Sequence, residues 1–418
     1  DGAALYDTTD LATLVQREYA GGVAGALTTA NGAGLLNEVV GLVDVQEYKA
    51  SNINVDVKSV TATGDYAGGA FGLLTGGEVD HVSVGAIETV TANNYAGGFV
   101  GRSGVGSLVD AKGLDILGLG AVEVGNLVSI GNLTSVDIKN STVAGSALTV
   151  SATGNTEGND YFAGGFVSEN NSGKIADSSV TGLKRVFTET TGYFWGDEDK
   201  LATSYAGGFA ARSQVGGLAN VGADGDTVGG LLGEDGLLEI DGLLEAVGYL
   251  IPSYTNCFVE FTDRDFDAAQ VSAAVAGGFI GEMQGGTVDN RGLNAENKEY
   301  AVRNAEYIEG TYYAGGFAGK ILSGGLAQSD GLSLLGNRID VSGLLKLIPT
   351  YIPKVYSAGV QSSADGLKVY ASKSDGKDVD SGSAGGYAGV TSGARISNSI
   401  VKELATKSEG TDTETDYA

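Results

Sequence analysis

The sequence is short of several residue types that particular functions require. Its 418 residues include one cysteine, one histidine, one tryptophan and three prolines. A single cysteine, Cys257, cannot form an internal disulfide. A single histidine, His81, cannot supply a two-histidine metal site. No apolar run approaches the roughly 20 residues that cross a bilayer, so no direct membrane span is expected.

Positive charge is also scarce. Lysine and arginine total 25 against 52 aspartates and glutamates, which gives a net charge of −27. Such an excess repels the phosphates of nucleic acids and anionic lipids, so nucleic acid is excluded as a partner. The first ten residues are acidic and do not resemble a signal peptide, and residues 405–418 resemble a linker. We expect any export signal or wall anchor to lie outside this chain.

Glycine is abundant, at 69 residues, and is concentrated in one recurring phrase of alanine, two glycines and apolar residues. The copies begin at Ala20, Ala67, Ala96, Ala163, Ala206, Ala276, Ala314 and Ala384. The intervals between them are 47, 29, 67, 43, 70, 38 and 70 residues, alternately long and short. Self-similarity of this kind is typical of stacked repeats, and the alternation suggests a double repeat as the unit.

A second pattern follows the phrase. In six copies a glycine ten residues after the alanine is followed by an apolar and then a polar residue at steps of two, and the last copy keeps the apolar and polar residues. The apolar members are Val79, Leu108, Ile175, Leu218, Val288, Leu326 and Ile396. The polar members are His81, Asp110, Asp177, Asn220, Asn290, Gln328 and Asn398. We therefore expect an apolar ladder beside a polar, amide-rich ladder at a bend.

The stretches between the phrases have the character of β-strands. Residues 53–64, 81–94, 147–154 and 257–263 are rich in valine, threonine and isoleucine and alternate apolar with polar. Since one unit cannot bury its apolar face alone, neighbouring units must stack, with equivalent residues about 4.8 Å apart. Aromatic residues before and within the phrase should then form columns, with glycines at the corners.

The sequence thus predicts an all-β fold, a right-handed parallel β-helix solenoid, the hand following the rule for parallel crossovers. We expect residues 1–18 to form an N-terminal capping segment, 19–404 the repeat domain and 405–418 an acidic linker. Leucine-rich insertions occupy 33–45, 112–133, 235–252 and 342–353, in alternate repeats. They are interpreted as a second apolar layer packed internally, with an exposed contact for a membrane or partner as the alternative.

The phrases at 96–112, 163–180 and 384–401 resemble the GLUG-type repeats of bacterial cell-surface β-helix proteins. The resemblance covers residues 19–404, although the Asn-Ser pair of that pattern is clear only at Asn398-Ser399. It implies a secreted or wall-anchored location and an adhesin-like role. The expected partners are then a glycan or protein of a host or neighbouring cell, or further copies of the chain in a filament.

Two loops carry candidate binding residues. Asp263, Asp265 and Asp267 form an Asp-x-Asp cluster that could ligate calcium, although solvated acidic loops are the default and no cofactor is otherwise expected. Tyr193, Phe194 and Trp195 are candidates for stacking on a sugar, with an aromatic plug as the alternative. Tyr312 and Tyr313 offer a second aromatic pair of the same kind.

Other chemistries fit less well. The stretch 315–321 contains Lys320, but its glycine spacing and Ile321 do not match a phosphate-binding loop. His81 belongs to the polar ladder, and Cys257 lies in an alternating strand without a base partner. Threonines such as Thr61 and Thr63 do not recur in strict register, which disfavours ice binding. No pair of carboxylates stands out as catalytic.

The sequence therefore predicts a non-enzymatic structural or adhesive module, a rigid shaft that displays variable loops. The alternative is a carbohydrate-binding or carbohydrate-cleaving β-helix protein, a polysaccharide hydrolase or lyase.

Overall fold

The computed structural model describes residues 12–16, 19–28, 48–104, 135–154, 160–189, 204–215, 251–263, 268–293, 300–323, 352–364, 366–371 and 382–402. The regular secondary structure in these ranges consists of β-strands alone. The strands form an 8-stranded and a 24-stranded sheet, and their pairings are parallel. The prediction of an all-β fold is confirmed.

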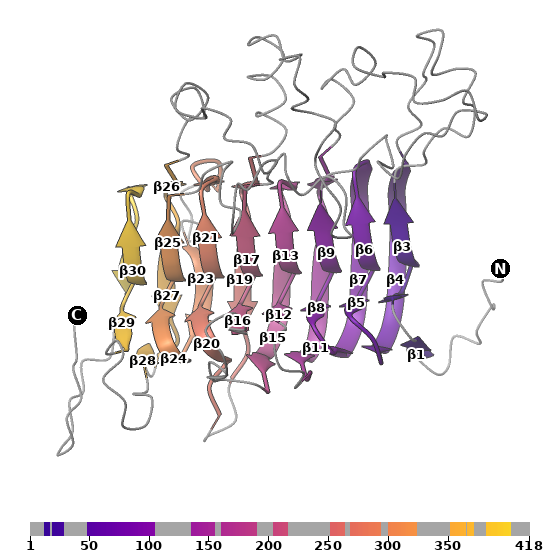
Figure 1. The fold of residues 1–418 in the computed structure, drawn as a ribbon, viewed down its shortest axis with the longest axis horizontal. Helices are drawn as coiled ribbons and strands as arrows, with labels where there is room; N and C mark the ends of the chain where they lie inside the picture. The colour runs from indigo at the N-terminus through magenta and orange to yellow at the C-terminus, as the bar shows by residue number, and fades with distance from the viewer. Residues whose placement is uncertain are drawn as a thin grey trace, which may run out of the picture.

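The smaller sheet contains the strands that follow each double glycine. Figure 1 shows them side by side in chain order, from β3 in indigo to β30 in yellow. They are β3 (Ala24–Thr28), β6 (Phe71–Thr75), β9 (Val100–Gly104), β13 (Val167–Asn171), β17 (Ala210–Gln214), β21 (Ile280–Gln284), β25 (Ala318–Leu322) and β30 (Ala388–Ser392). Sequence order therefore becomes spatial order along the molecule.

The larger sheet is made of three further sets of strands. The set that ends in the double glycine is β2 (Tyr19–Gly21), β5 (Tyr66–Gly68), β8 (Tyr95–Gly97), β12 (Tyr161–Gly164), β16 (Ser204–Gly207), β20 (Val271–Gly277), β24 (Tyr307–Gly315) and β29 (Ser383–Gly385). The second set is β4 (Lys49–Ala62), β7 (Glu78–Ala92), β10 (Asp137–Lys139), β14 (Lys174–Ala176), β18 (Ser253–Thr255), β22 (Thr287–Asp289), β26 (Lys354–Tyr356) and β31 (Arg395–Ser397). The third is β1 (Ala12–Gln16), β11 (Thr142–Ala152), β15 (Ser179–Thr188), β19 (Phe258–Phe261), β23 (Tyr300–Ala305), β27 (Gly359–Ser362), β28 (Lys368–Ala371) and β32 (Val401–Lys402).

Each copy of the phrase pairs with the next copy along the chain. The eight alanines form one continuous column of parallel partners, from Ala20 to Ala384. We call one phrase with the strands that follow it a layer. The stacking unit is therefore one phrase, and the expected double repeat is wrong. The alternation of intervals reflects the lengths of connections rather than the number of layers.

The second ladder exists, but three of its predicted members are replaced. The paired column is Ala50, Val79, Ile138, Ile175, Tyr254, Val288, Val355 and Ile396. Leu108, Leu218 and Leu326 lie outside the described residues. The ladder resumes only after each long insertion, so fixed spacing from the phrase fails in alternate layers.

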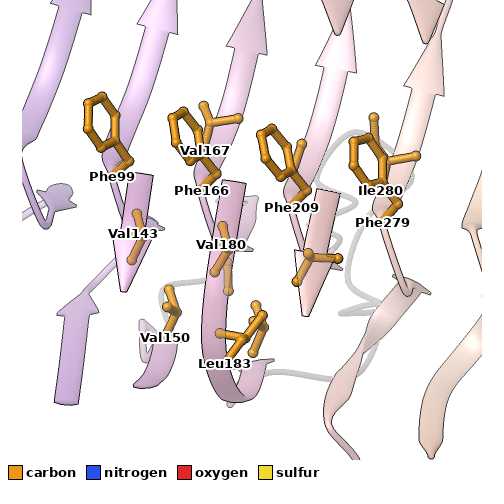
Figure 2. Packing of buried hydrophobic residues seen from close by; sticks show 14 of the residues in the cluster. Phe99, Val143, Val150, Phe166, Val167, Val180, Leu183, Phe209, Phe279 and Ile280 are labelled. Atoms are coloured by element: carbon orange, nitrogen blue, oxygen red, sulfur yellow. The ribbon is translucent and has the colours of Figure 1, made fainter. Parts of the chain in front are cut away.

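The core is built from columns of like side chains. Rings of Phe99, Phe166, Phe209, Phe279 and Phe317 are fully buried, with consecutive centroids 4.6–5.3 Å apart and nearly parallel planes. Figure 2 shows four of these rings facing a row of valine and leucine side chains. The predicted aromatic columns are confirmed. Offset stacking of this kind adds about 0.5–1.5 kcal/mol per pair to the burial of the rings.

The phrase glycines are required for close approach between layers. A Cβ added to Gly165 would lie 1.9 Å from the carbonyl oxygen of Gly208 in the next layer. A methyl group cannot fit there, so alanine at this position would force the layers apart. Left-handed backbone occurs instead at Gly76, Gly77, Gly285 and Gly286, which precede the second set of strands.

The predicted strands at 53–64, 81–94, 147–154 and 257–263 fall within β4, β7, β11 and β19 apart from a few terminal residues. Residues 12–16 of the expected capping segment pair with β4. The leucine-rich insertions lie outside the described residues except for 251–252 and 352–353, and so does the linker 405–418. No helix in the described ranges has the length and hydrophobicity to cross a membrane.

Candidate functional site

The calcium candidates are only partly described. Asp263 lies just after β19 and is exposed, whereas Asp265 and Asp267 lie outside the described residues. Within the described ranges, no three acidic, histidine or cysteine side chains gather as a metal site. The calcium site therefore stays a prediction.

The first aromatic candidates, Tyr193, Phe194 and Trp195, also lie outside the described residues, between β15 and β16 in the chain. The second pair is described. Tyr312 is buried, and Tyr313 is half-buried with the Lys320 ammonium 4.5 Å from its ring centroid. Tyr313 therefore packs against its own chain on that side rather than offering an open ring face.

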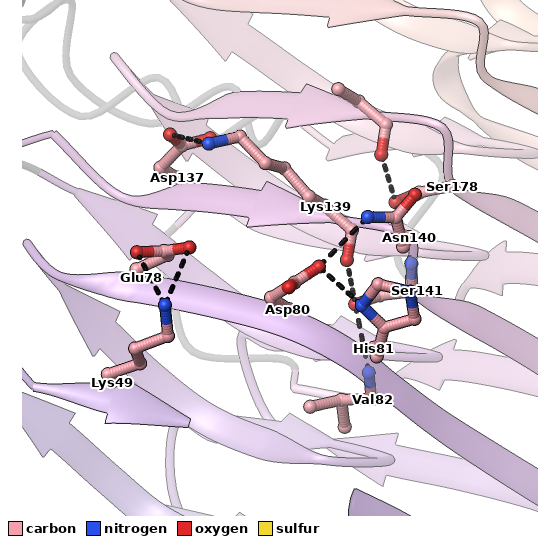
Figure 3. A network of polar contacts seen from close by, with 11 residues as sticks. Lys49, Glu78, Asp80, His81, Val82, Asp137, Lys139, Asn140, Ser141 and Ser178 are labelled. Atoms are coloured by element: carbon pink, nitrogen blue, oxygen red, sulfur yellow. Dashed lines mark hydrogen bonds and ion pairs between the residues drawn. The ribbon is translucent and has the colours of Figure 1, made fainter. Parts of the chain in front are cut away.

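His81 lies at the bend that the sequence predicted as a polar ladder. Its backbone is left-handed, at φ 54°, as are Asn140 and Asp177 at the equivalent places in the next two layers. Its Nδ1 is 2.8 Å from a carboxylate oxygen of Asp80, which also accepts a hydrogen bond from Asn140 (Figure 3). The hydrogen bond from Asn140 lowers the pKa of Asp80 most, and the charge of His81 adds to it. The exposed imidazole lies on β7 at a residue with left-handed backbone and contacts the neighbouring Asp80, so we assign His81 a structural role.

Cys257 occupies a column of hydroxyl groups. The side chains of Ser141, Ser178 and Cys257 each donate to the carbonyl oxygen two residues earlier, at 2.7, 2.7 and 3.3 Å. Burial raises the pKa of Cys257 to about 12, so the thiol stays protonated near neutral pH. A protonated thiol is a poor nucleophile, and the side chain acts here as a turn-stabilising donor.

Lys320 belongs to an unexpected feature, an alternating charge ladder on the smaller sheet. Arg102, Glu169, Arg212, Glu282 and Lys320 are paired in register on five successive strands, β9 to β25. Their signs alternate along the whole run. Each carboxylate thus lies between two cations, which favours this order of layers over any shifted one.

Glu169 is the most enclosed member of the ladder. Its side chain is 0% exposed, with one oxygen 2.7 Å from Nε of Arg102 and the other 3.2 Å from Nε of Arg212. Gln214 donates a further hydrogen bond of 3.2 Å to it. Burial alone raises the pKa of Glu169, but attraction to Arg212 and then Arg102 outweighs it and the net pKa is lowered. The carboxylate is therefore held ionised.

A second column of rings lies beside the ladder. Tyr19, Tyr66, Tyr95, Phe162 and Tyr205 stack with centroids 4.8–5.2 Å apart and planes within 12°. The guanidinium of Arg212 lies 4.6 Å from the Phe162 centroid, and that of Arg102 lies 5.3 Å from the Tyr95 centroid. Phe162 and Tyr205 form a small buried cluster with Ala211 and Val275, separate from the main core. We call the ladder and these rings together the charged strip.

The chemistry of the charged strip favours stacking over catalysis. A carboxylate with a lowered pKa and with both oxygens bound to cations is a weak general base. Rings that stack on one another cover their faces, so the interior of the column offers edges rather than a surface for a sugar. The strip instead bridges successive layers by charge and by ring contact.

The alternating charges of the strip could have been predicted from the sequence. Position six after the phrase alanine is Arg102, Glu169, Arg212, Glu282 and Lys320 in five consecutive copies. Sequence reasoning used this position only to reject a phosphate-binding loop. The missing step was to treat it as a column in which neighbouring layers meet.

Hydroxyl residues recur in register over only part of the larger sheet. Thr61, Thr91 and Ser151 are successive partners, and Thr91 and Ser151 share a hydrogen bond of 3.1 Å. The next partner in this column is Phe187. The row thus ends after three layers, and Ser151 is 5% exposed. So short and enclosed a row does not make an extended flat array.

Comparison with known proteins adds little to these observations. No protein-family model matches the chain, and no curated protein matches it. Among solved structures, a "putative immunoglobulin A1 protease" from Bacteroides ovatus matches with a TM-score of 0.34 and 13% identity, over 92% of this chain and 85% of that one. A likeness at this level carries no argument about fold or activity. The chain is thus defined by its own structure, an all-β protein of parallel, stacked repeats.

Proposed function

We propose that the chain is a right-handed parallel β-helix solenoid that serves as a rigid shaft. Support comes from the valine column Val55, Val84, Val143, Val180, Val259, Val302, Val360 and Val401, in which every member pairs with the next. The charged strip and the phenylalanine column add side-chain contacts between the same layers. Repeats that contact only their neighbours in this way form elongated, stiff bodies.

The function of such a shaft is structural or adhesive, without catalysis, in a bacterial cell-surface or extracellular protein. The observation that carries this proposal is the column of phrase alanines, in which each alanine pairs with the next through all eight layers. Residues that bind a partner are often found in the loops that connect the strands of a rigid scaffold. Rigid layers would hold these connections in position while they contact a partner.

Location and partner rest on the repeat itself. The likeness of the glycine phrase to GLUG-type repeats favours a secreted or wall-anchored protein. The partner is then a glycan or protein of a host or neighbouring cell surface. Calcium at Asp263, Asp265 and Asp267 belongs to the same proposal as an accessory ion.

The alternative is a protein that binds or cleaves polysaccharide. Among the described residues, Glu169 and Glu282 are the buried carboxylates, and each is ion-paired, Glu169 with two arginines and Glu282 with Lys320 at 3.5 Å. The pKa of Glu169 is lowered, whereas a catalytic acid needs a raised one, and the Glu282 carboxylate is already paired with the Lys320 ammonium. A catalytic role would therefore have to use other carboxylates.

A glycan array tests the proposal and separates it from the alternative. The wild-type chain is compared with Trp195→Ala and with a matched control, Tyr370→Ala, which removes an aromatic ring from β28. We expect selective glycan binding that Trp195→Ala weakens and the control leaves unchanged. Absence of signal for the wild type would remove sugar binding and leave a protein partner. Release of shorter sugars from any polysaccharide would instead support the enzyme.

A further inference from the structure

Two stretches of the described residues match the acceptor sequence for N-linked glycosylation. That sequence is asparagine, any residue but proline, then serine or threonine. One match is Asn-Ser-Thr at 140–142 and the other is Asn-Asn-Ser at 170–172. A match of three residues does not by itself show that a sugar can be attached. The structure separates the two, because it places their first asparagines in opposite environments.

Asn170 lies inside the core. It is 0% exposed. Its amide nitrogen donates to the carbonyl oxygen of Gly173 at 3.0 Å and to the hydroxyl of Tyr254 at 3.1 Å. An amide nitrogen has two hydrogens, so both are in use. A sugar at Asn170 would remove one of these bonds and force a bulky polar group into a close-packed interior.

Asn140 lies at an exposed bend between the end of β10 and the start of β11 (Figure 3). Its backbone is left-handed, at φ 49°, a conformation that asparagine tolerates better than most residues. Its N–H donates to the carbonyl oxygen of Ala176 in the next layer at 3.1 Å. The bend is therefore held by the backbone, and the side chain is left at the surface.

The amide nitrogen of Asn140 keeps a hydrogen that a sugar can replace. It donates one hydrogen bond, of 2.9 Å, to a carboxylate oxygen of Asp80 in the preceding layer. Among the described residues, no second acceptor contacts it. An N-glycosidic bond replaces one amide hydrogen and leaves the other. Attachment of a sugar is therefore compatible with the bond to Asp80.

The neighbours of Asn140 leave its surface open. The same bend in the adjoining layers carries His81 and Asp177, which are both exposed and polar. A glycan is bulky and hydrophilic, and at such a place it displaces no packed side chain. The hydroxyl of Thr142, which completes the acceptor sequence, is half-buried and bonds to Ser83 at 3.1 Å. A hydroxyl rotates easily, so it can turn toward an enzyme.

We infer that Asn140 is an N-glycosylation site and that Asn170 is not. The nitrogen Nδ2 of Asn140 forms a bond to the anomeric carbon of an oligosaccharide carried on a lipid diphosphate. The bond from that carbon to the diphosphate breaks, and the diphosphate leaves with the electron pair. The displaced amide proton goes to a base of the transferase. The inference rests on the extracellular location proposed above, because this modification is typical of surface loops in secreted proteins.

Peptide mapping of the protein from its native source tests the inference. We expect a peptide that contains Asn140 and carries a sugar mass. Treatment with a peptide N-glycosidase should release that mass and convert Asn140 to aspartate, while Asn170 stays an unmodified asparagine. An unmodified Asn140 in the native protein would overturn the inference, and so would a sugar on Asn170.

Variants produced in the same source separate the acceptor sequence from mere exposure. Asn140→Gln and Thr142→Ala should each abolish the sugar at this site, whereas Thr142→Ser keeps the acceptor sequence and should retain it. The matched control is Asn52→Gln, since Asn52 is exposed and left-handed at the same bend of an earlier layer but begins no acceptor sequence. It should leave the sugar in place. A sugar that persists in Thr142→Ala would also contradict the inference. An unmodified protein that still binds its partner on the array would leave the proposed function standing.

Discussion

Replacing Glu169 by glutamine tests whether the charged strip holds the layers together. The substitution keeps the shape of the side chain and one hydrogen-bond acceptor but removes the negative charge between Arg102 and Arg212. The guanidinium groups of Arg102 and Arg212 would then lie on either side of a neutral amide instead of a carboxylate. We expect a clear loss of stability without a change of fold.

The magnitude follows from the burial of the three groups. Breaking a buried ion pair by removing one partner costs about 3–5 kcal/mol, because the remaining charge stays desolvated. Arg212 and Arg102 are 17% and 32% exposed, so water screens part of the effect. We therefore expect about 3 kcal/mol. The control is Lys49→Ala, which breaks a pair on the surface in which Lys49 is 60% exposed, and it should cost about 1 kcal/mol or less.

Urea unfolding followed by circular dichroism at several pH values is the assay. The folded pKa of Glu169 is lowered, so its contribution is fully present above the unfolded pKa of about 4.3 and is lost as pH falls through the folded pKa. The difference between wild type and Glu169→Gln should therefore be largest near neutral pH and shrink below about pH 4. A difference that is negligible near neutral pH, or that does not change with pH, would refute the reasoning.

Four other substitutions and one thiol reaction test the packing of the layers. Gly165→Ala places a methyl group on the carbonyl of Gly208 and should cost about 3 kcal/mol or more, whereas Gly104→Ala, with nothing within 4 Å, should cost less than about 1 kcal/mol. Phe209→Ala opens the ring column and should lower stability by about 3–5 kcal/mol in urea unfolding. The thiol of Cys257 should react with a disulfide reagent only after unfolding, and a fast reaction of the folded protein would contradict its burial. The variant Cys257→Ser should fold normally, because Ser141 and Ser178 occupy the same column in other layers.

The sequence was enough to predict the strands and the columns that share a fixed distance from the glycine phrase. Each phenylalanine of the buried column stands three residues after the alanine of its own phrase, and each copy therefore labels its own layer. The ladder through Ile138, Tyr254 and Val355 could not be predicted in this way, because long insertions separate these residues from their phrases. The cost of closing a loop grows only slowly with its length, so chain distance says little about which strand resumes the stack.

The charged strip could be predicted in part from the sequence. Its five residues stand at one fixed position in the phrase, so the sequence alone determined that their signs alternate. Only the tertiary structure decided that Glu169 lies enclosed between Arg102 and Arg212, because burial depends on which side chains converge from neighbouring layers. Features that depend on spacing within the phrase can be predicted from the sequence. Desolvation and charge pairing cannot, because they arise only when distant segments are brought into contact.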